Sequence, residues 1–323
     1  MSLTLLVSMM LAFAFSISVA VAIGGSSMLG LAIFESGKLV LAPKEMFAAI
    51  DKFPLAAVPF FILAGNLMET GGISRRLVEF AKSIVGGVQG GLPMTCVLTC
   101  MIFAAVSGSS VATTFAIGAI LIPALIKHGY PTTYAAALQA TSAELGVVIP
   151  PSIPLILYGV SAEVSIGELF IAGFGPGLLI GGALMLFVWA WCKWKGWGKN
   201  DGDGRLPFWR AFLQAGWALL MPVIILGGIY GGIFTPTEAS AVAVFYALVI
   251  GMVIYREIGV RDLYAILRRS VISSAVIMFI IANAGLFAAS ILALTDTAVA
   301  HALAEFRARQ TQDVLDQLDP RPA

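Results

Sequence analysis

Apolar stretches recur along the whole chain and are separated by short polar connectors. A membrane-spanning helix needs about 20 mostly apolar residues. Stretches that reach or approach this length, together with some shorter apolar pieces, cover residues 3–23, 28–34, 53–68, 94–106, 111–126, 169–192, 217–233, 239–255 and 271–294. The pattern predicts an all-α protein built as a polytopic bundle of transmembrane helices.

Two interruptions break the apolar pattern at membrane depth. The first is SGSSVATT at residues 107–114, inside a run from Met94 to Ile126 that carries no formal charge. The second is GVVIPPSIP at residues 146–154, which places three prolines and a serine in an apolar stretch. Polar groups left unpaired in lipid cost several kcal/mol, so hydroxyls at this depth need partners. Interrupted helices of this kind build the sites of secondary transporters.

The second interruption lies inside residues 134–160, a segment too long and too broken for one regular helix. We expect a helical hairpin or re-entrant loop there, with its non-helical tip facing protein or a wet cavity. Residues 74–88 mix basic and apolar side chains and predict an amphipathic helix at the membrane interface. A solvated connector is the alternative for that segment.

The hydroxyls of the first interruption suit a monovalent cation when freed backbone carbonyls lie beside them. Gly108 lets the backbone leave helical geometry, and Pro150 and Pro151 remove N–H donors and so free carbonyls. Small residues also permit close helix packing, and for either stretch taken by itself packing is the favoured interpretation. Two stretches with opposite kinds of helix breaker favour an ion site.

Glu144 lies directly before the proline interruption, where a charge is expensive in a membrane. It is a candidate cation ligand, proton carrier or substrate contact. The alternative is a carboxylate on a water-exposed flank. Glu238, in FTPTEAS, fits a helix N-terminus that Thr235 or Thr237 caps.

Composition agrees with a membrane setting. Hydrophobic residues make up 59% of the 323 residues and charged residues 11%, against about 25% charged in soluble domains. The net charge of +1 comes without a basic cluster, so a nucleic-acid partner is not expected. Cys96, Cys100 and Cys192 lie in apolar segments and fit packing better than a disulfide framework. No Lys or Arg precedes Lys38, so the first apolar run is expected to be a span rather than a cleaved signal peptide.

Basic residues predict the orientation. They gather in the connectors 193–210 and 256–269, which should both be cytoplasmic. Residues 161–168 carry two glutamates and no basic residue, which predicts the opposite side.

Enzyme motifs are absent from the sequence. It contains no HExxH, no GxxxxGK[ST] and no GxSxG, and a nucleophile at Ser109 would lack a base at membrane depth. We therefore expect no enzyme and no cofactor.

Several stretches, in order, resemble the DctM-type large membrane subunit of tripartite ATP-independent periplasmic (TRAP) transporters. They are FPLAAVPFFILAGNLMETGGISRRLVEFA, FAAVSGSSVATTFAIGAILIPALIKHGY, LGVVIPPSIPLILYGV, SIGELFIAGFGPGLL and GGIYGGIFTPTEASAVAVFYALVIG. The resemblance covers residues 1 to about 290.

The resemblance implies a sodium-coupled symporter that imports organic acids such as dicarboxylates across the bacterial inner membrane. It implies a small DctQ-type membrane subunit and a periplasmic solute-binding protein as partners. It also implies an inverted-repeat architecture that moves like an elevator. Na⁺ as coupling ion and the substrate would lie at Ser107, Gly108, Ser109, Ser110, Thr113, Glu144, Gly146, Pro150, Pro151 and Ser152.

The expected organisation has five parts. Scaffold spans and the interfacial helix occupy residues 1–91, and a first transport repeat occupies 92–192 with its hairpin near 134–160. A cytoplasmic connector (193–210), further spans (211–295) and a non-membrane tail (296–323) follow. Since such subunits carry a second hairpin repeat, we expect this chain to be truncated or frameshifted after the first. A non-transporting membrane scaffold is the alternative function, and an intramembrane enzyme is a weaker one.

Overall fold

The computed structural model describes residues 2–34, 42–199 and 205–295, which contain helices and no strand. Seven helical segments in these ranges are long and apolar enough to cross a membrane, judged by length and composition. They are Phe53–Thr70, Ser110–Lys127, Thr132–Ala162, Ile166–Lys195, Phe208–Tyr230, Pro236–Ile254 and Val260–Ala288. The predicted all-α polytopic bundle is confirmed. The predicted tail, residues 296–323, lies outside the described residues.

The chain divides into two compact units. One comprises the described residues up to Lys52 and those from Ala275 onward, and the other comprises Phe53–Ser274. The long helix α14 (Val260–Thr295) contributes to both. The part boundaries expected from the sequence stay a prediction.

The first unit contains α1 (Ser2–Ala14), α2 (Val19–Phe34), α3 (Ala42–Ile50) and the second part of α14. A small core of Leu31, Ala42 and Leu286 holds it together. The sequence predicted one span over residues 3–23, but the chain turns between α1 and α2, where Ser16 has a φ of 57°.

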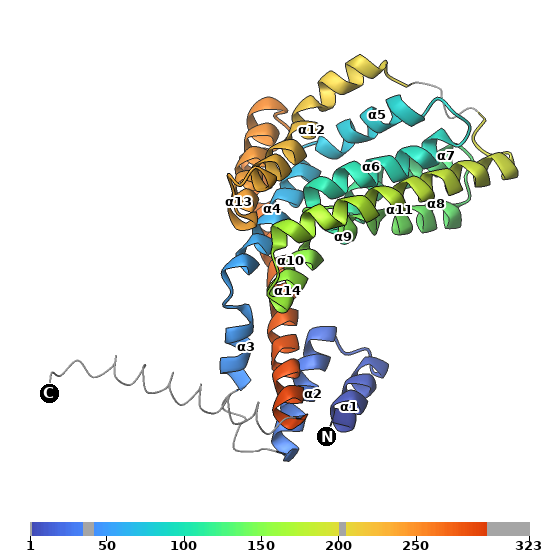
Figure 1. Ribbon diagram of the computed structural model, residues 1–323. Coiled ribbons are helices and arrows are strands. Elements are labelled where there is room, and N and C mark those ends of the chain that lie inside the picture. The colour runs from blue at the N-terminus through green and yellow to red at the C-terminus, as the bar shows by residue number, and fades with distance from the viewer. Residues whose placement is uncertain (1, 35–41, 200–204, 296–323) are drawn as a thin grey trace, which may run out of the picture. The chain divides into compact units, whose positions relative to one another are not determined.

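The second unit is organised around α6 (Gly91–Ser107). This helix packs against α5 (Ile73–Val85), α7 (Ser110–Lys127), α8 (Thr132–Ala143) and α11 (Ile166–Lys195), as Figure 1 shows. Phe103, on α6, and Phe170, on α11, are fully buried.

A second layer of the same unit pairs helices distant in sequence. The short η2 (Phe53–Ala56) leads into α4 (Ala57–Thr70), which packs along α13 (Pro236–Val249). The latter continues into a π-helical turn, η3 (Ile250–Ile254). Helix α12 (Phe208–Tyr230) packs on α5.

Helix α5 is the predicted amphipathic segment. Its apolar residues Ile73, Leu77 and Ala81 are fully buried, and Phe80 contacts the rings of Phe208 and Phe212 on α12. The apolar face of α5 is therefore covered by other helices of the same unit.

Local sequence explains where α13 begins. Thr235 caps the helix by accepting from the Glu238 N–H at 3.3 Å, while the Glu238 carboxylate accepts from the Thr235 N–H at 2.8 Å. This capping box confirms that Glu238 serves a helix N-terminus.

The helical hairpin lies elsewhere than predicted. Residues 134–160 form an interrupted helix, made of α8, α9 (Leu145–Val148) and α10 (Ile153–Ala162). Helix α8 packs on α6 and α7, whereas α10 packs on α11, so the two segments have different neighbours. The antiparallel hairpin is instead α6 with α7, joined by Gly108 and Ser109. The segment fails to form a hairpin because α8 is held by its packing on α6 and α7.

Both basic connectors start from the same end of the second unit. The Tyr255 hydroxyl, at the end of α13 and η3, donates to the Gln214 carbonyl of α12 at 3.0 Å. Tyr246 donates to the Trp217 carbonyl at 2.7 Å. These bonds show that α12 and α13 are antiparallel, so the start of α12 and the end of η3 lie at one end of the unit, as the sequence predicted.

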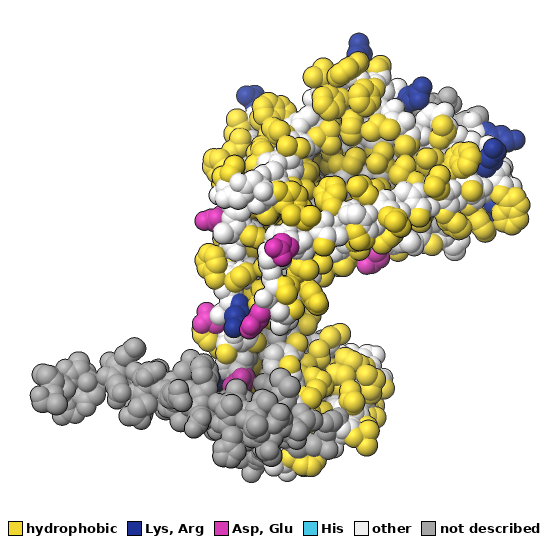
Figure 2. All heavy atoms as spheres, viewed as in Figure 1, with side chains coloured by type: hydrophobic (Ala, Val, Ile, Leu, Met, Phe, Trp, Pro, Cys, Tyr) yellow, Lys and Arg dark blue, Asp and Glu magenta, His cyan; other side chains and the backbone are white. Residues whose placement is uncertain are grey.

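On the face that Figure 2 shows, apolar side chains cover much of the second unit, and basic side chains lie along its edge, several of them toward the end where α11 stops. Exposed large residues include Leu179, Leu186 and Phe245. Such a surface suits lipid rather than water.

Candidate functional site

The first interruption is the tight turn of the α6–α7 hairpin. Gly108 ends α6 with a φ of 61°, a left-handed conformation that glycine adopts without penalty. Ser109 has extended backbone and caps α7, because its hydroxyl accepts from the Ala112 N–H at 3.3 Å. Two residues therefore reverse the chain at this point.

The second interruption separates α9 from α10. Ile149 is extended after α9, and Ser152 then caps α10 by accepting from the Leu155 N–H at 3.5 Å. The Ser152 hydroxyl also donates to the Val147 carbonyl, which bridges the gap between the two helices. The prolines at 150 and 151 are buried.

The two interruptions touch each other. The Ile153 N–H donates to the Gly108 carbonyl at 3.1 Å, and a Cβ at Gly108 would strike the Pro151 carbonyl oxygen. A Cβ at Gly146 would lie 3.1 Å from the Ser110 nitrogen. We call this contact region, residues 107–110 with 146–153, the break junction.

Four helix ends meet at the break junction. Helices α7 and α10 begin there, and helices α6 and α9 end there. A helix N-terminus carries a partial positive charge and free N–H groups, and a C-terminus carries a partial negative charge and free carbonyls. The N-termini of α7 and α10 thus favour an anion at the junction, and the C-termini of α6 and α9 favour a cation.

The hydroxyls of the first interruption find partners inside the chain. Thr113 donates to the Ser109 carbonyl and Thr114 to the Ser110 carbonyl, both at 2.8 Å. Ser107 and Thr113 share a hydrogen bond of 3.2 Å. Ser107, Thr113 and Thr114 therefore have the partners that hydroxyls at this depth need, because the turn brings carbonyls and hydroxyls within reach.

A polar cluster continues from the junction into the packing of α6 with α8. The Gln139 side chain donates to the Thr113 carbonyl at 3.3 Å and accepts from the Cys96 thiol at 3.1 Å. It also donates to the Cys100 sulfur at 3.6 Å. Gln139 is fully buried, as are both cysteines, which are free thiols. Cys96 and Cys100 lie one turn apart on α6, and both sulfurs contact the Gln139 side chain.

Ser142 completes this cluster and is the residue that the sequence prediction omitted. It lies three residues after Gln139 and four before Gly146, so all three share one helical face. Gln139 contacts α7 at Thr113, and Gly146 contacts it at Ser110, which places Ser142 between them. Its hydroxyl is fully buried and has no hydrogen-bond partner among the described residues. The spacing of Gln139, Ser142 and Gly146, which puts these residues on one helical face, was the sequence signal that could have identified Ser142.

Glu144 is exposed at the end of α8. The structure therefore does not bring its carboxylate into the buried cluster. The remaining predicted residues of both interruptions lie at the break junction, apart from Thr113, which lies in the first turn of α7 and shares a hydrogen bond with Ser107.

Comparison with known proteins shows the family. Residues 4–313 match the family model described as the tripartite ATP-independent periplasmic transporter, DctM component. The chain belongs to the DctM family. The family description and the names of the relatives are those of transporter permeases.

Relatives carry names with different substrates. The chain is 46% identical over 242 residues to the isethionate TRAP transporter permease protein DctMQ of Oleidesulfovibrio alaskensis. It is 42% identical over 270 residues to the C4-dicarboxylate large permease protein DctM of Pseudomonas aeruginosa. It is 38% identical over 257 residues to the sialic acid large permease protein SiaM of Vibrio cholerae.

These matches cover most of this DctM-family chain but only part of each relative. The share of this chain is 75%, 83% and 80%, and the share of the relative is 38%, 62% and 60%, in the same order. The chain spans about 38% to 62% of the length of these relatives.

Proposed function

We propose that this chain provides the first half-site of a sodium-coupled TRAP permease that imports organic acids. The observation that carries the proposal is the break junction, where the turn of the α6–α7 hairpin touches the break in the interrupted helix α8–α10. Discontinuous helices with this arrangement bind substrates and coupling ions in secondary transporters.

The anion would bind at the helix N-termini. Helices α7 and α10 both start at the junction behind serine caps, so their first-turn N–H groups and dipoles favour a carboxylate. The names of relatives support this class of substrate, since they include C4-dicarboxylate, 2,3-diketo-L-gulonate and sialic acid.

The sodium ion would bind on the oxygen-rich side. The end of α6 and the Ser142 hydroxyl, which has no partner among the described residues, supply neutral oxygen ligands. Hard oxygen ligands without a formal charge suit a monovalent cation, and α8 places Ser142 at the level of the hairpin turn.

Membership of the DctM family is the basis for proposing two partner proteins. A small DctQ-type membrane subunit and a periplasmic solute-binding protein would act with this chain. The name DctMQ of the Oleidesulfovibrio alaskensis relative supports a small subunit.

The test uses proteoliposomes that hold the permease containing this chain, its small subunit and its binding protein. A labelled organic acid should accumulate when an inward sodium gradient is imposed and the binding protein is present. An equal potassium gradient is the control. Equal accumulation with potassium, or full accumulation without the binding protein, would contradict the proposal.

A further inference from the structure

An apolar groove lies at the surface of the second unit, away from the break junction. Its volume is about 500 Å³, within the usual range of small-molecule sites. Its walls come from the end of the α5–α6 loop, the first turn of α6 and the last part of α11. The lining residues are Val88, Met94, Gly182, Met185, Leu186 and Trp189.

The groove runs along α11 for about 10 Å, since Gly182 and Trp189 are seven residues apart. Trp189 lies at its end near the α11 C-terminus, a position where tryptophan marks the headgroup level of a membrane. From Trp189 the groove extends toward the centre of α11, between apolar side chains. An elongated apolar occupant fits this shape better than a polar solute does.

Positive charge lies at the tryptophan end. The Lys193 ammonium is 5.1 Å from the centre of the Trp189 ring. The Arg205 guanidinium lies so close to Gly87, beside Val88, that a Cβ there would strike it. Both basic side chains belong to the connector that the sequence places in the cytoplasm, and Figure 2 shows basic side chains gathered at this end of the unit.

We propose that this groove binds one acyl chain of an anionic phospholipid of the inner leaflet, with the headgroup phosphate between Lys193 and Arg205. The apolar walls account for the acyl chain and the two cations for the preference for an anionic headgroup. This lipid site does not rest on the proposed sodium-coupled transport.

The test measures lipid retention by native mass spectrometry of the purified chain in detergent. Dioleoyl phosphatidylglycerol and dioleoyl phosphatidylethanolamine are added separately, so that acyl chains match and only the headgroup charge differs. The chain should retain one phosphatidylglycerol at concentrations where little phosphatidylethanolamine is retained. Equal retention of the two lipids would overturn the proposal.

Filling the groove tests its position. Gly182 lines the groove and a Cβ there meets nothing within 4 Å, so the longer side chain of Gly182→Leu should fill the groove, whereas Gly182→Ala leaves most of it open. Gly182→Leu should abolish the selective retention and Gly182→Ala should keep it. Gly216→Leu on α12, whose Cβ also meets nothing within 4 Å, is the matched control and should bind like the unchanged chain.

Removing the charges tests the headgroup site. Lys193→Gln with Arg205→Gln should lower the preference for phosphatidylglycerol at least about fivefold, while binding of phosphatidylethanolamine stays unchanged. Selective retention that survives either Gly182→Leu or the double charge variant would contradict the site. Crosslinking of Leu186→Cys to a second copy or to a small subunit in preference to lipid would also contradict it.

Discussion

Gly108 is the residue on which the contact between the two interruptions depends most directly. Its φ of 61° is accessible to glycine but costs other residues about 1–2 kcal/mol. Its missing side chain also lets the Pro151 carbonyl approach, and its own carbonyl accepts the Ile153 N–H. Backbone conformation and contact therefore both require glycine at this position.

The variant Gly108→Ala should lower the free energy of unfolding by more than about 2 kcal/mol, because the conformational cost and the clash add. Gly129→Ala is the matched control. Gly129 has a φ of 85° but its Cβ would meet nothing within 4 Å, so only the conformational cost applies. Thermal unfolding in detergent compares the two variants, and equal losses would show that the Pro151 contact contributes nothing.

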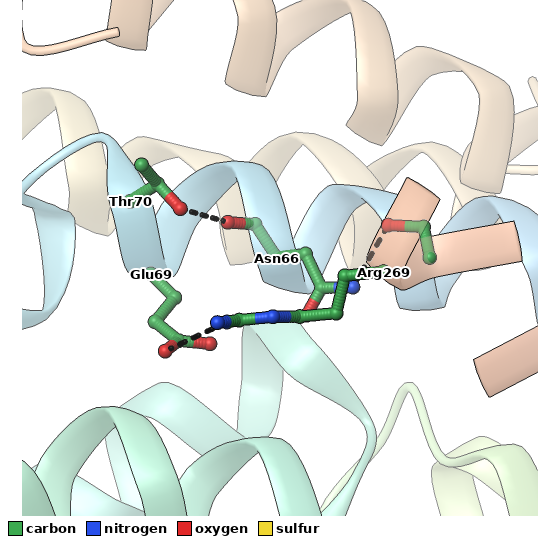
Figure 3. Close-up of polar contacts among 5 residues, drawn as sticks. Asn66, Glu69, Thr70 and Arg269 are labelled. Carbon is green, nitrogen blue, oxygen red and sulfur yellow. Dashed lines mark hydrogen bonds and ion pairs between the residues drawn. The ribbon is translucent and has the colours of Figure 1, made fainter. Parts of the chain in front are cut away.

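At the scale of elements, α4 and α14 are joined by polar side chains (Figure 3). The Asn66 amide donates to the Ser270 hydroxyl at 2.8 Å, and both residues are buried. Arg269 pairs with Glu69 at 3.4 Å, with 64% of the arginine side chain exposed. A buried hydrogen bond between helices contributes more than an exposed ion pair does, because water and ions screen the pair.

Replacement of Asn66 by alanine should therefore cost about 0.5–2 kcal/mol, since it leaves the Ser270 hydroxyl unpaired. The change Glu69→Gln should cost well below about 1 kcal/mol. Unfolding midpoints of the two variants in the same detergent give the comparison. A larger loss for Glu69→Gln than for Asn66→Ala would contradict this ranking.

At the scale of the whole molecule, the chain is an inner-membrane bundle whose two basic connectors lie on one side of the second unit. Single cysteines at Lys199 and Asp262, in a background without Cys96, Cys100 and Cys192, should both be protected in intact cells. An impermeant thiol reagent should label them only after the membrane is opened. Cysteine at Val164, in the connector before α11, should be labelled from outside. Labelling of either basic connector in intact cells would reverse the orientation.

Much of this architecture could be predicted from the sequence, because apolar stretches and helix breakers act locally. The spans, the amphipathic helix, the capping box at Glu238 and both interruptions followed from residue patterns. The hairpin was assigned to the wrong segment because long-range packing decides which break reverses the chain. Gly108 and Ser109 turn α6 back on α7, whereas α8 and α10 find different neighbours.

The candidate site could be predicted only in part, because local patterns reveal the two breaks but not the packing around them. Hydroxyl-rich and proline-rich breaks are visible as composition, and they do meet. The buried state of Ser142 and the exposure of Glu144 depend on how α8 rotates against α6 and α7, which the local pattern does not fix. The sequence analysis chose Glu144 as a candidate ligand because a charge beside a helix break is unusual in a membrane. The buried, neutral Ser142 fits the proposed sodium site better.

The sodium dependence of uptake by the Ser142→Ala permease tests the central claim most directly. The Ser142 hydroxyl is buried and has no partner in the described part of the chain, so its removal should not destabilise the fold and a change in uptake would report on the site. Loss of one neutral ligand should raise the sodium concentration for half-maximal uptake about tenfold. Thr141→Ala is the control, because the exposed Thr141 hydroxyl bonds its own helix at Ala137. An unchanged sodium requirement in Ser142→Ala, or an equal shift in Thr141→Ala, would contradict a coupling-ion site at the break junction.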